Sequence, residues 1–232
     1  LLAGQVSLLL DFRGANMSVA SACATSGHAL GEAAAAIARD DADVMLAGGA
    51  ESTVTPLAIG AFAQMRALST RNDAPEKASR PYDKDRDGFV LSEGSVVFVL
   101  EELEHARRRG ARIYAELRGY GASSDAFHLS SLAPGAEGSA RSMRAALARA
   151  KLAPTDIDYV SAHATSTPGG DGEEAAAIAN VFAEQKASLN VSGVKSMTGH
   201  LLGAAGAMGA FAAVFAIHHG IVPPTLNLDN LD

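Results

Sequence analysis

The feature that most constrains the fold is a recurring order of short apolar strand, turn and helix. We expect apolar strands at 17–20, 44–47, 95–100, 113–117, 157–160 and 189–194, and helices at 24–38, 101–109 and 138–152. Several of these strands are continuous apolar runs, which is typical of strands buried on both faces. The alternation predicts a layered α/β fold with buried, largely parallel sheets.

The charge balance and one apolar stretch exclude two classes of partner. The chain has 19 basic and 26 acidic side chains, for a net charge of −7 with histidine neutral. Nucleic-acid binding needs a basic excess or a basic stripe, so we expect no nucleic-acid partner. The apolar stretch 201–217 is shorter than the roughly 20 residues that span a bilayer. It also contains small residues that suit close packing, so we expect a buried helix and no membrane insertion.

The chain has a single cysteine, Cys23, which excludes an internal disulfide and a cysteine-rich zinc site. Cys23 lies where an apolar strand meets an alanine-rich helix, and the positive end of the helix dipole favours its thiolate. Small neighbours, Ala22 and Ala24, let a substrate approach the sulfur. Most free cysteines are small buried hydrophobes. In this context a nucleophile is an equally good interpretation.

Two histidines follow predicted strands. His163 opens the segment HATSTP, and His200 closes the segment KSMTGH, which begins at Lys195. A lone histidine at a strand end is more often a structural hydrogen-bonding residue than a catalyst. Two of them, accompanied by a lysine, are less easily explained in that way. Together with Cys23 they predict thiol chemistry in which two imidazoles stabilise developing negative charge.

Two acidic patterns have simpler explanations than a binding site. The run DKDRDG at 83–88 resembles the start of an EF-hand loop, whose twelfth position must be a bidentate glutamate. Counted from Asp83, that position is Gly94, and Glu93 comes one residue early. We therefore predict a charged turn rather than a calcium site. The acidic residues within 171–174 are interpreted as the favourable first turn of a helix.

The combination resembles the β-ketoacyl-[acyl-carrier-protein] synthases, most closely the elongating type II enzymes of bacterial fatty-acid synthesis. The matching segments run in family order over essentially the whole chain and are ACATSG at 22–27, RALST at 66–70, SRPYD at 79–83, RDGFV at 86–90, HATSTP at 163–168 and KSMTGHLLG at 195–203. The set is far more specific than any one member.

The resemblance implies a thiolase-like layered αβαβα fold that is incomplete in this chain and truncated at both ends. Residues 1–110 would be the end of the N-terminal half, which carries the nucleophile. Residues 111–232 would be most of the C-terminal half, which carries both catalytic histidines. We expect this chain alone to be inactive or poorly folded.

The resemblance also implies an acyltransferase similar to 3-oxoacyl-[acyl-carrier-protein] synthase II. It would condense an acyl-cysteine with a malonyl-carrier protein, with loss of carbon dioxide, in fatty-acid elongation. Cys23 would be acylated, His163 and His200 would hold the malonyl thioester carbonyl, and Lys195 would tune the site near His163. Matches to substrate-binding residues are Phe62 in the acyl pocket, Thr165 and Thr167 on the phosphopantetheine arm, and Arg66 on the acidic carrier protein. The family implies a cytoplasmic homodimer without metal or cofactor.

Three departures from the family pattern keep alternatives open. The family usually has glycine where this chain has Ala164, its Gly-Phe-Gly-Gly loop is absent, and Gly209 is common in polyketide ketosynthases. A polyketide-type ketosynthase is therefore one alternative. A coenzyme-A thiolase is another, although the HATSTP segment differs from the thiolase motif. A non-catalytic carrier-protein-binding fragment is the third, although such partners typically lose the nucleophile that Cys23 represents.

Overall fold

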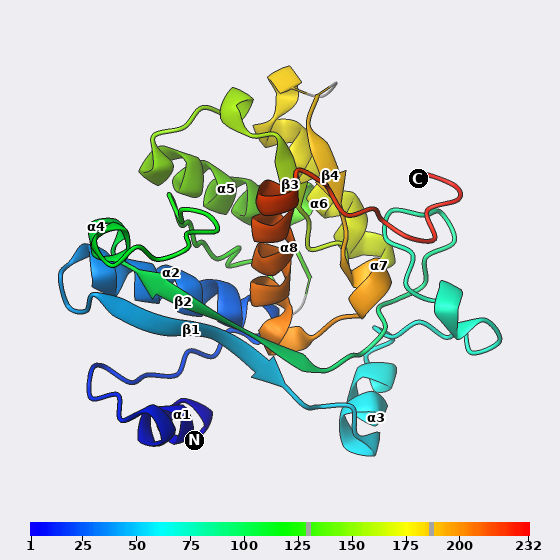
Figure 1. Cartoon of the computed structure of the whole chain (residues 1–232). Helices are drawn as coiled ribbons and strands as arrows, with labels where there is room; N and C mark the ends of the chain where they lie inside the picture. The colour runs from blue at the N-terminus through cyan, green and yellow to red at the C-terminus, as the bar shows by residue number, and fades with distance from the viewer. Residues whose placement is uncertain (129–130, 186–187) are drawn as a thin grey trace.

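The computed structural model describes residues 1–128, 131–185 and 188–232 (Figure 1). In chain order the helices and strands are α1 (Leu2–Leu10), α2 (Thr25–Ala38), β1 (Val44–Glu51), α3 (Pro56–Gln64), β2 (Gly94–Glu101), α4 (Leu103–Arg108), α5 (Glu137–Ala150), β3 (Tyr159–Ser161), α6 (Pro168–Val181), β4 (Asn190–Ser192), α7 (Lys195–Thr198) and α8 (Ala205–His219). Short 3-10 turns connect several of them, including one at Ala22–Ala24 directly before α2.

Among the described residues, the four strands form one antiparallel pair and one parallel pair. β1 pairs with β2 in antiparallel register, beginning with Val44 opposite Glu101, whereas β3 pairs with β4 in parallel. The expectation of buried, largely parallel sheets is therefore wrong for β1 and β2. Val97 and Val99 of β2 are exposed. An antiparallel pair can leave one face to solvent in this way, whereas parallel sheets are covered on both faces.

Most predicted elements form close to their expected bounds. The helices expected at 24–38 and 138–152 are α2 and α5, and the helix expected at 101–109 is shortened to α4. The strands expected at 17–20 and 113–117 are wrong, since neither segment pairs with a strand in the part of the chain that the structure describes. A strand requires a backbone partner on a neighbouring strand, and local hydrophobicity does not reveal whether one is present.

The apolar stretch at 201–217 forms most of α8, which is buried on one side only. Alanines 205, 207, 212 and 216 are buried, whereas Phe211, Phe215 and Ile217 are exposed. Within the described residues, Leu202–His219 has 18 residues at a hydropathy of 1.4, enough by length and composition to cross a membrane, and 17% of it is buried. The expectation of a fully buried helix is therefore wrong, because only one face of α8 is buried. Its contacts with α2 and with β1–β3 place one face of α8 against the protein.

Two clusters of buried apolar side chains lie on either side of α8. One packs α2 against β1 through Leu30, Ala33 and Ala47. The other joins α5, α6 and β3 and includes Ala177 and Ile178. Figure 1 shows α8 standing between these two groups of elements. Residues from both halves of the sequence therefore meet near the N-terminal end of α8.

The N-terminal turns of α2 and α8 are in direct contact. Ser26 is fully buried, and its Oγ accepts the backbone N–H of Ala207 at 2.8 Å. A Cβ placed on Gly206 would lie 2.6 Å from the backbone nitrogen of Gly27, closer than real Cβ atoms approach. Glycine at 206 therefore permits the close crossing, which brings Cys23 beside the segment that precedes α8.

The charged turn predicted at 83–88 contains a buried carboxylate. Asp83 accepts a hydrogen bond from Arg80 Nε at 3.0 Å and the backbone N–H groups of Asp85, Asp229 and Asn230. Burial alone would raise the pKa of Asp83, but these donors outweigh it and hold the pKa below its ordinary value. Asp83 therefore attaches the C-terminal residues to this turn, a role that its sequence context did not indicate.

Candidate active site

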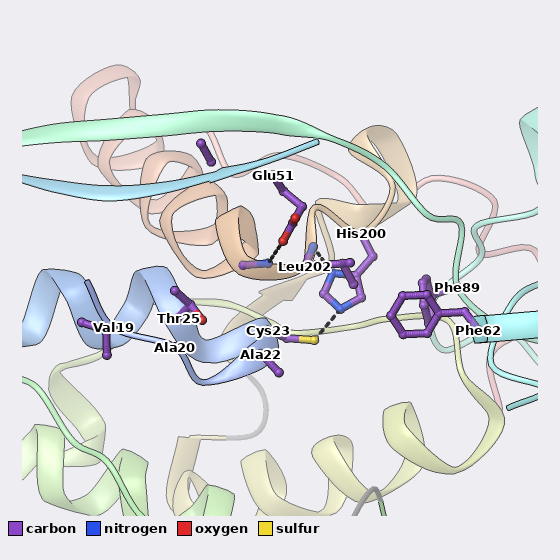
Figure 2. Close-up of a pocket in the computed structure, with 12 residues that line it drawn as sticks. Val19, Ala20, Ala22, Cys23, Thr25, Glu51, Phe62, Phe89, His200 and Leu202 are labelled. Carbon is purple, nitrogen blue, oxygen red and sulfur yellow. Dashed lines mark hydrogen bonds between the residues drawn. The ribbon is translucent and has the colours of Figure 1, made fainter. Parts of the chain in front are cut away.

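Cys23 is presented by a turn of unusual backbone conformation. Ala22 has φ of 48°, in the left-handed region that residues with a Cβ adopt infrequently. Two hydrogen bonds fix the turn: Ser21 N–H donates to Thr25 Oγ1 at 2.9 Å, and Ser21 Oγ lies 2.6 Å from His28 Nδ1. The turn leaves the Cys23 side chain half-buried at the entrance to α2, where its sulfur faces a pocket (Figure 2).

His200 is held with one ring nitrogen against the sulfur. Its Nε2 lies 3.0 Å from Cys23 Sγ, and its Nδ1 accepts the backbone N–H of Leu202 at 3.2 Å (Figure 2). Because a backbone N–H can only donate, Nδ1 is the acceptor and Nε2 carries the proton that points to sulfur. Burial, followed by the positive charge of Lys195, lowers the pKa of His200 to about 3. The imidazole is therefore neutral at physiological pH.

Lys195 fixes His163 in the same tautomer as His200, with the proton on Nε2. Lys195 Nζ donates to the backbone oxygen of His163 at 2.5 Å and lies 3.4 Å from its Nδ1. An ammonium has no acceptor, so Nδ1 accepts and Nε2 carries the proton. Although His163 is exposed on one side, the protein around its ring and then Lys195 lower its pKa well below the ordinary value. The rings of His163 and His200 are 5.3 Å apart and nearly perpendicular.

Cys23, His163 and His200 also have the donor set of a metal site. One sulfur and two ring nitrogens lie within 4.8 Å of one another. A metal-bound imidazole, however, normally donates its second N–H to an acceptor. Both Nδ1 atoms here receive hydrogen bonds from donors, so both Nε2 lone pairs are protonated. This geometry suits two N–H donors that bind an oxyanion better than it suits a metal.

The thiol itself is less acidic than its position before a helix suggested. Burial raises the pKa of Cys23 above its ordinary value, and the opposing charge of Lys195 only partly compensates. The expected preference for the thiolate is therefore wrong for the free site. The loss of hydration at the half-buried sulfur outweighs the charge of Lys195 and a backbone hydrogen bond, which both favour the thiolate.

Two acidic residues of α6 hold the loop that carries His163. Glu174 accepts the backbone N–H groups of His163 at 2.6 Å and Ala164 at 2.7 Å. Asp171 accepts the backbone N–H of Ser166 at 3.0 Å. The interpretation of these carboxylates as the first turn of a helix was incomplete, because they bind the preceding loop. Their spacing of three residues, directly after a histidine-containing loop, was the available signal.

A pocket of about 460 Å³ opens beside Cys23 and His200. Figure 2 shows Phe62 and Phe89 on one side of it and Val19 on the other. The rings of Phe62 and Phe89 pack edge to face at 5.3 Å. The wall is mainly apolar, so the pocket fits a hydrocarbon chain attached to the sulfur.

The remaining residues singled out from the sequence lie apart from this pocket. Thr165 is buried, and its Oγ1 lies 2.9 Å from Oγ1 of Thr167 on the His163 loop. Neither threonine lines the pocket. Arg66 is exposed just beyond α3, with φ of 56°. The structure therefore brings Cys23, His163, His200 and Lys195 together, with Phe62 close by and Arg66 outside.

Comparison with known proteins gives consistent family matches. A model described as the N-terminal domain of β-ketoacyl synthase matches residues 1–106, and one described as the C-terminal domain matches residues 114–229. The chain is 54% identical over 229 residues to 3-oxoacyl-[acyl-carrier-protein] synthase 2 of Coxiella burnetii, covering 99% of this chain and 55% of that protein. It is 53% identical to the mitochondrial 3-oxoacyl-[acyl-carrier-protein] synthase of Arabidopsis thaliana, covering 99% and 50%. The chain thus spans about half the length of the curated relatives it matches.

Solved structures agree with this result. A type II polyketide ketosynthase, in complex with its acyl-carrier protein and bound to a hexaketide, superimposes with a TM-score of 0.96 at 38% identity. That match covers 99% of this chain and 57% of the other. A β-ketoacyl synthase from Burkholderia phymatum gives a TM-score of 0.93 at 43% identity, covering 99% and 55%.

Proposed function

The chain belongs to the β-ketoacyl synthase family, and from this premise we propose that it carries the catalytic residues of a 3-oxoacyl-[acyl-carrier-protein] synthase of fatty-acid elongation. The family and the thiolase-like α/β fold predicted from the motifs are confirmed by its relatives and structural neighbours. The observation that carries the proposal is the contact of 3.0 Å between Cys23 Sγ and a His200 Nε2 whose proton is fixed toward it.

The first half-reaction stores an acyl group on Cys23. The sulfur attacks the carbonyl of an acyl thioester, and the carrier thiol leaves with the proton of the Cys23 thiol. A C–S bond forms at Cys23 as the carrier's C–S bond breaks. The pocket beside the sulfur would accept the acyl chain, with Phe62 in its wall. This covalent step divides a difficult condensation into two easier ones.

The second half-reaction uses the two imidazoles. A malonyl thioester places its carbonyl oxygen against the Nε2–H groups of His163 and His200. Loss of carbon dioxide leaves an electron pair on the α-carbon, and the resulting enolate oxygen is stabilised by these donors. The carbon then attacks the acyl carbonyl, and Cys23 leaves as the thiolate. Both rings are neutral at neutral pH because both histidine pKa values are lowered, and the hydrogen bonds at their Nδ1 atoms keep the proton on Nε2.

The roles of the surrounding residues belong to the same proposal. Lys195 fixes the tautomer of His163, and Thr165 and Thr167 bind the phosphopantetheine arm. Arg66, exposed on an acidic chain, contacts an acidic carrier protein. The structural neighbour that carries an acyl-carrier protein supports this partner class. Residues 1–110 are the end of the N-terminal half of the fold and residues 111–232 are most of its C-terminal half, in a cytoplasmic homodimer without cofactor.

The test combines labelling with turnover in the intact protein that carries this sequence. Cys23 is the single cysteine of these 232 residues, and peptide mapping of the iodoacetamide-treated protein measures its labelling separately from that of any other residue. We expect near-stoichiometric labelling that abolishes condensation, and malonyl-carrier decarboxylation that requires both histidines. Labelling as slow as that of an ordinary buried cysteine, or decarboxylation unaffected by His163→Ala, would reject the proposal. Parallel assays of the 232-residue chain test whether it turns over alone.

A polyketide-type ketosynthase is the second candidate. One structural neighbour is a polyketide ketosynthase, and a Cβ placed on Gly209 would lie 3.5 Å from Ser161 Oγ, an ordinary van der Waals distance. Ser161 Oγ is itself buried without a hydrogen-bond partner among the described residues. Products decide between the two: repeated condensation without keto reduction would favour the polyketide type. A single condensation that stops until the keto group is reduced would favour fatty-acid elongation.

A further inference from the structure

Tyr82 contacts both carboxylates that hold the His163 loop, although it lies outside the catalytic group. Its hydroxyl donates to Glu174 Oε2 at 3.0 Å, and its backbone N–H donates to Asp171 Oδ2 at 2.9 Å. No sequence feature of the SRPYD segment indicated such contacts. Tyr82 therefore connects the 79–83 segment with the first turns of α6.

The Glu174 oxygen that accepts a hydrogen bond from Tyr82 also accepts one from the loop that carries His163. Oε2 receives the backbone N–H of Ala164 at 2.7 Å, and Oε1 receives that of His163 at 2.6 Å. Ala164 has φ of 41°, a conformation that persists only where surrounding contacts enforce it. A carboxylate that could rotate would not enforce it, and the Tyr82 hydroxyl adds a contact from outside the loop that limits this rotation.

Tyr82 is itself well fixed. Its carbonyl accepts the backbone N–H of Asp232 at 3.0 Å, and its ring packs against the cluster that contains Ala177 and Ile178. Burial, followed by the negative charge of Glu174, raises the pKa of Tyr82 above its ordinary value. The hydroxyl therefore remains protonated and continues to donate at any physiological pH.

We propose that Tyr82 is a positioning residue for His163: its hydroxyl fixes the Glu174 carboxylate, which fixes the backbone from which the His163 ring projects. The proposal rests on the function proposed above. His200 reaches Cys23 through separate elements, the segment between α7 and α8. Tyr82 thus acts on the decarboxylation that needs both imidazoles, and leaves the reactivity of Cys23 unchanged.

The test compares Tyr82→Phe with Tyr159→Phe in the intact protein. Tyr159 is a matched control because it is also half-buried and its hydroxyl lies 2.9 Å from Ser192 Oγ, on the β3–β4 pair. In Tyr82→Phe we expect kcat for malonyl-carrier decarboxylation to fall about tenfold, the effect of one hydrogen bond to a charged group. KM and the rate of Cys23 alkylation stay within about twofold. Tyr159→Phe leaves all three unchanged.

A double variant tests whether Tyr82 acts on kcat through Glu174. In Glu174→Gln the carboxylate is already lost, so adding Tyr82→Phe should lower kcat no further. Independent losses that multiply would overturn the proposal. So would an unchanged kcat in Tyr82→Phe, or an equal fall in decarboxylation and alkylation, which indicates general loosening.

One readout is independent of turnover. Amide hydrogen exchange at His163 and Ala164 should be faster in Tyr82→Phe and unchanged in Tyr159→Phe. Unchanged exchange in Tyr82→Phe would overturn the positioning role even in a protein without activity. If the wild-type protein neither decarboxylates nor condenses, the proposed function is rejected. If exchange at His163 and Ala164 is nevertheless faster in Tyr82→Phe, the positioning of the His163 loop by Tyr82 is still supported.

Discussion

Replacing Lys195 by methionine tests the electrostatics of the site most directly. Lys195 is 5% exposed, and its Nζ approaches both Nδ1 and the backbone oxygen of His163. Its charge lowers the pKa values of His163, His200 and Cys23. Methionine has a similar length without the charge. In the variant, therefore, the thiolate of Cys23 should become less stable and both imidazoles more basic.

The size of the effect follows from the geometry. Nζ lies 3.4 Å from His163 Nδ1, and one ring nitrogen of His163 lies within 4.8 Å of the sulfur, so the charge lies at most roughly 8 to 10 Å from the sulfur. At an effective dielectric constant of about 20, a unit charge at that distance contributes about 2 kcal/mol. This energy corresponds to roughly a 30-fold smaller thiolate population at any pH below the thiol pKa.

The assay is the pH profile of Cys23 alkylation by iodoacetamide. The burial-raised thiol pKa means that the rate increases with pH in the wild type. In Lys195→Met the profile should move to higher pH, with rates about 30-fold lower on the acidic side and equal rates well above both midpoints. Lys77→Met, at an exposed position, is the control. A profile that is unchanged or moves to lower pH would refute the electrostatic reasoning.

Three further predictions concern stability and the pocket. Asp83→Asn should destabilise the fold by about 3 kcal/mol in urea unfolding at pH 7, since it breaks a buried ion pair. Because the folded pKa of Asp83 is lowered, its contribution is present above the unfolded pKa and lost as pH falls, so the difference should shrink in acid. Gly206→Ala should lower Tm and slow Cys23 alkylation, because its methyl group would displace Gly27; an unchanged Tm would contradict the tight crossing. Phe62→Ala should enlarge the pocket and raise acylation rates for long over short acyl groups, and an unchanged ratio of rates would place the acyl chain elsewhere.

The proposed catalytic residues Cys23, His163, His200 and Lys195 could be singled out from the sequence because each lies next to a recognisable local element. Cys23 precedes an alanine-rich helix, and His163 follows a strand whose apolar residues are contiguous in sequence. Such signals depend on a few neighbouring residues. Their convergence in space was an inference from the family resemblance, and the contacts of Lys195 and His200 support it.

The supporting contacts were not predictable from the same signals. Tyr82 and Glu174 are far apart in sequence, and nothing local indicates that they share a hydrogen bond. The antiparallel pairing of β1 with β2 depends on the course of the connection between them. The segment 113–117 has the composition of a strand but is assigned no partner strand among the described residues, and local composition does not contain that information.

The orientation of the two imidazoles has a consequence for the lifetime of the stored acyl group. His163 and His200 both present Nε2–H to the space beside Cys23, because their Nδ1 atoms are occupied by Lys195 and by the backbone of Leu202. Neither ring has a free lone pair there, so neither can take a proton from a water molecule. In the proposed cycle, water that enters the site is therefore not activated for hydrolysis. The acyl group on Cys23 is therefore protected from hydrolysis until the malonyl substrate binds.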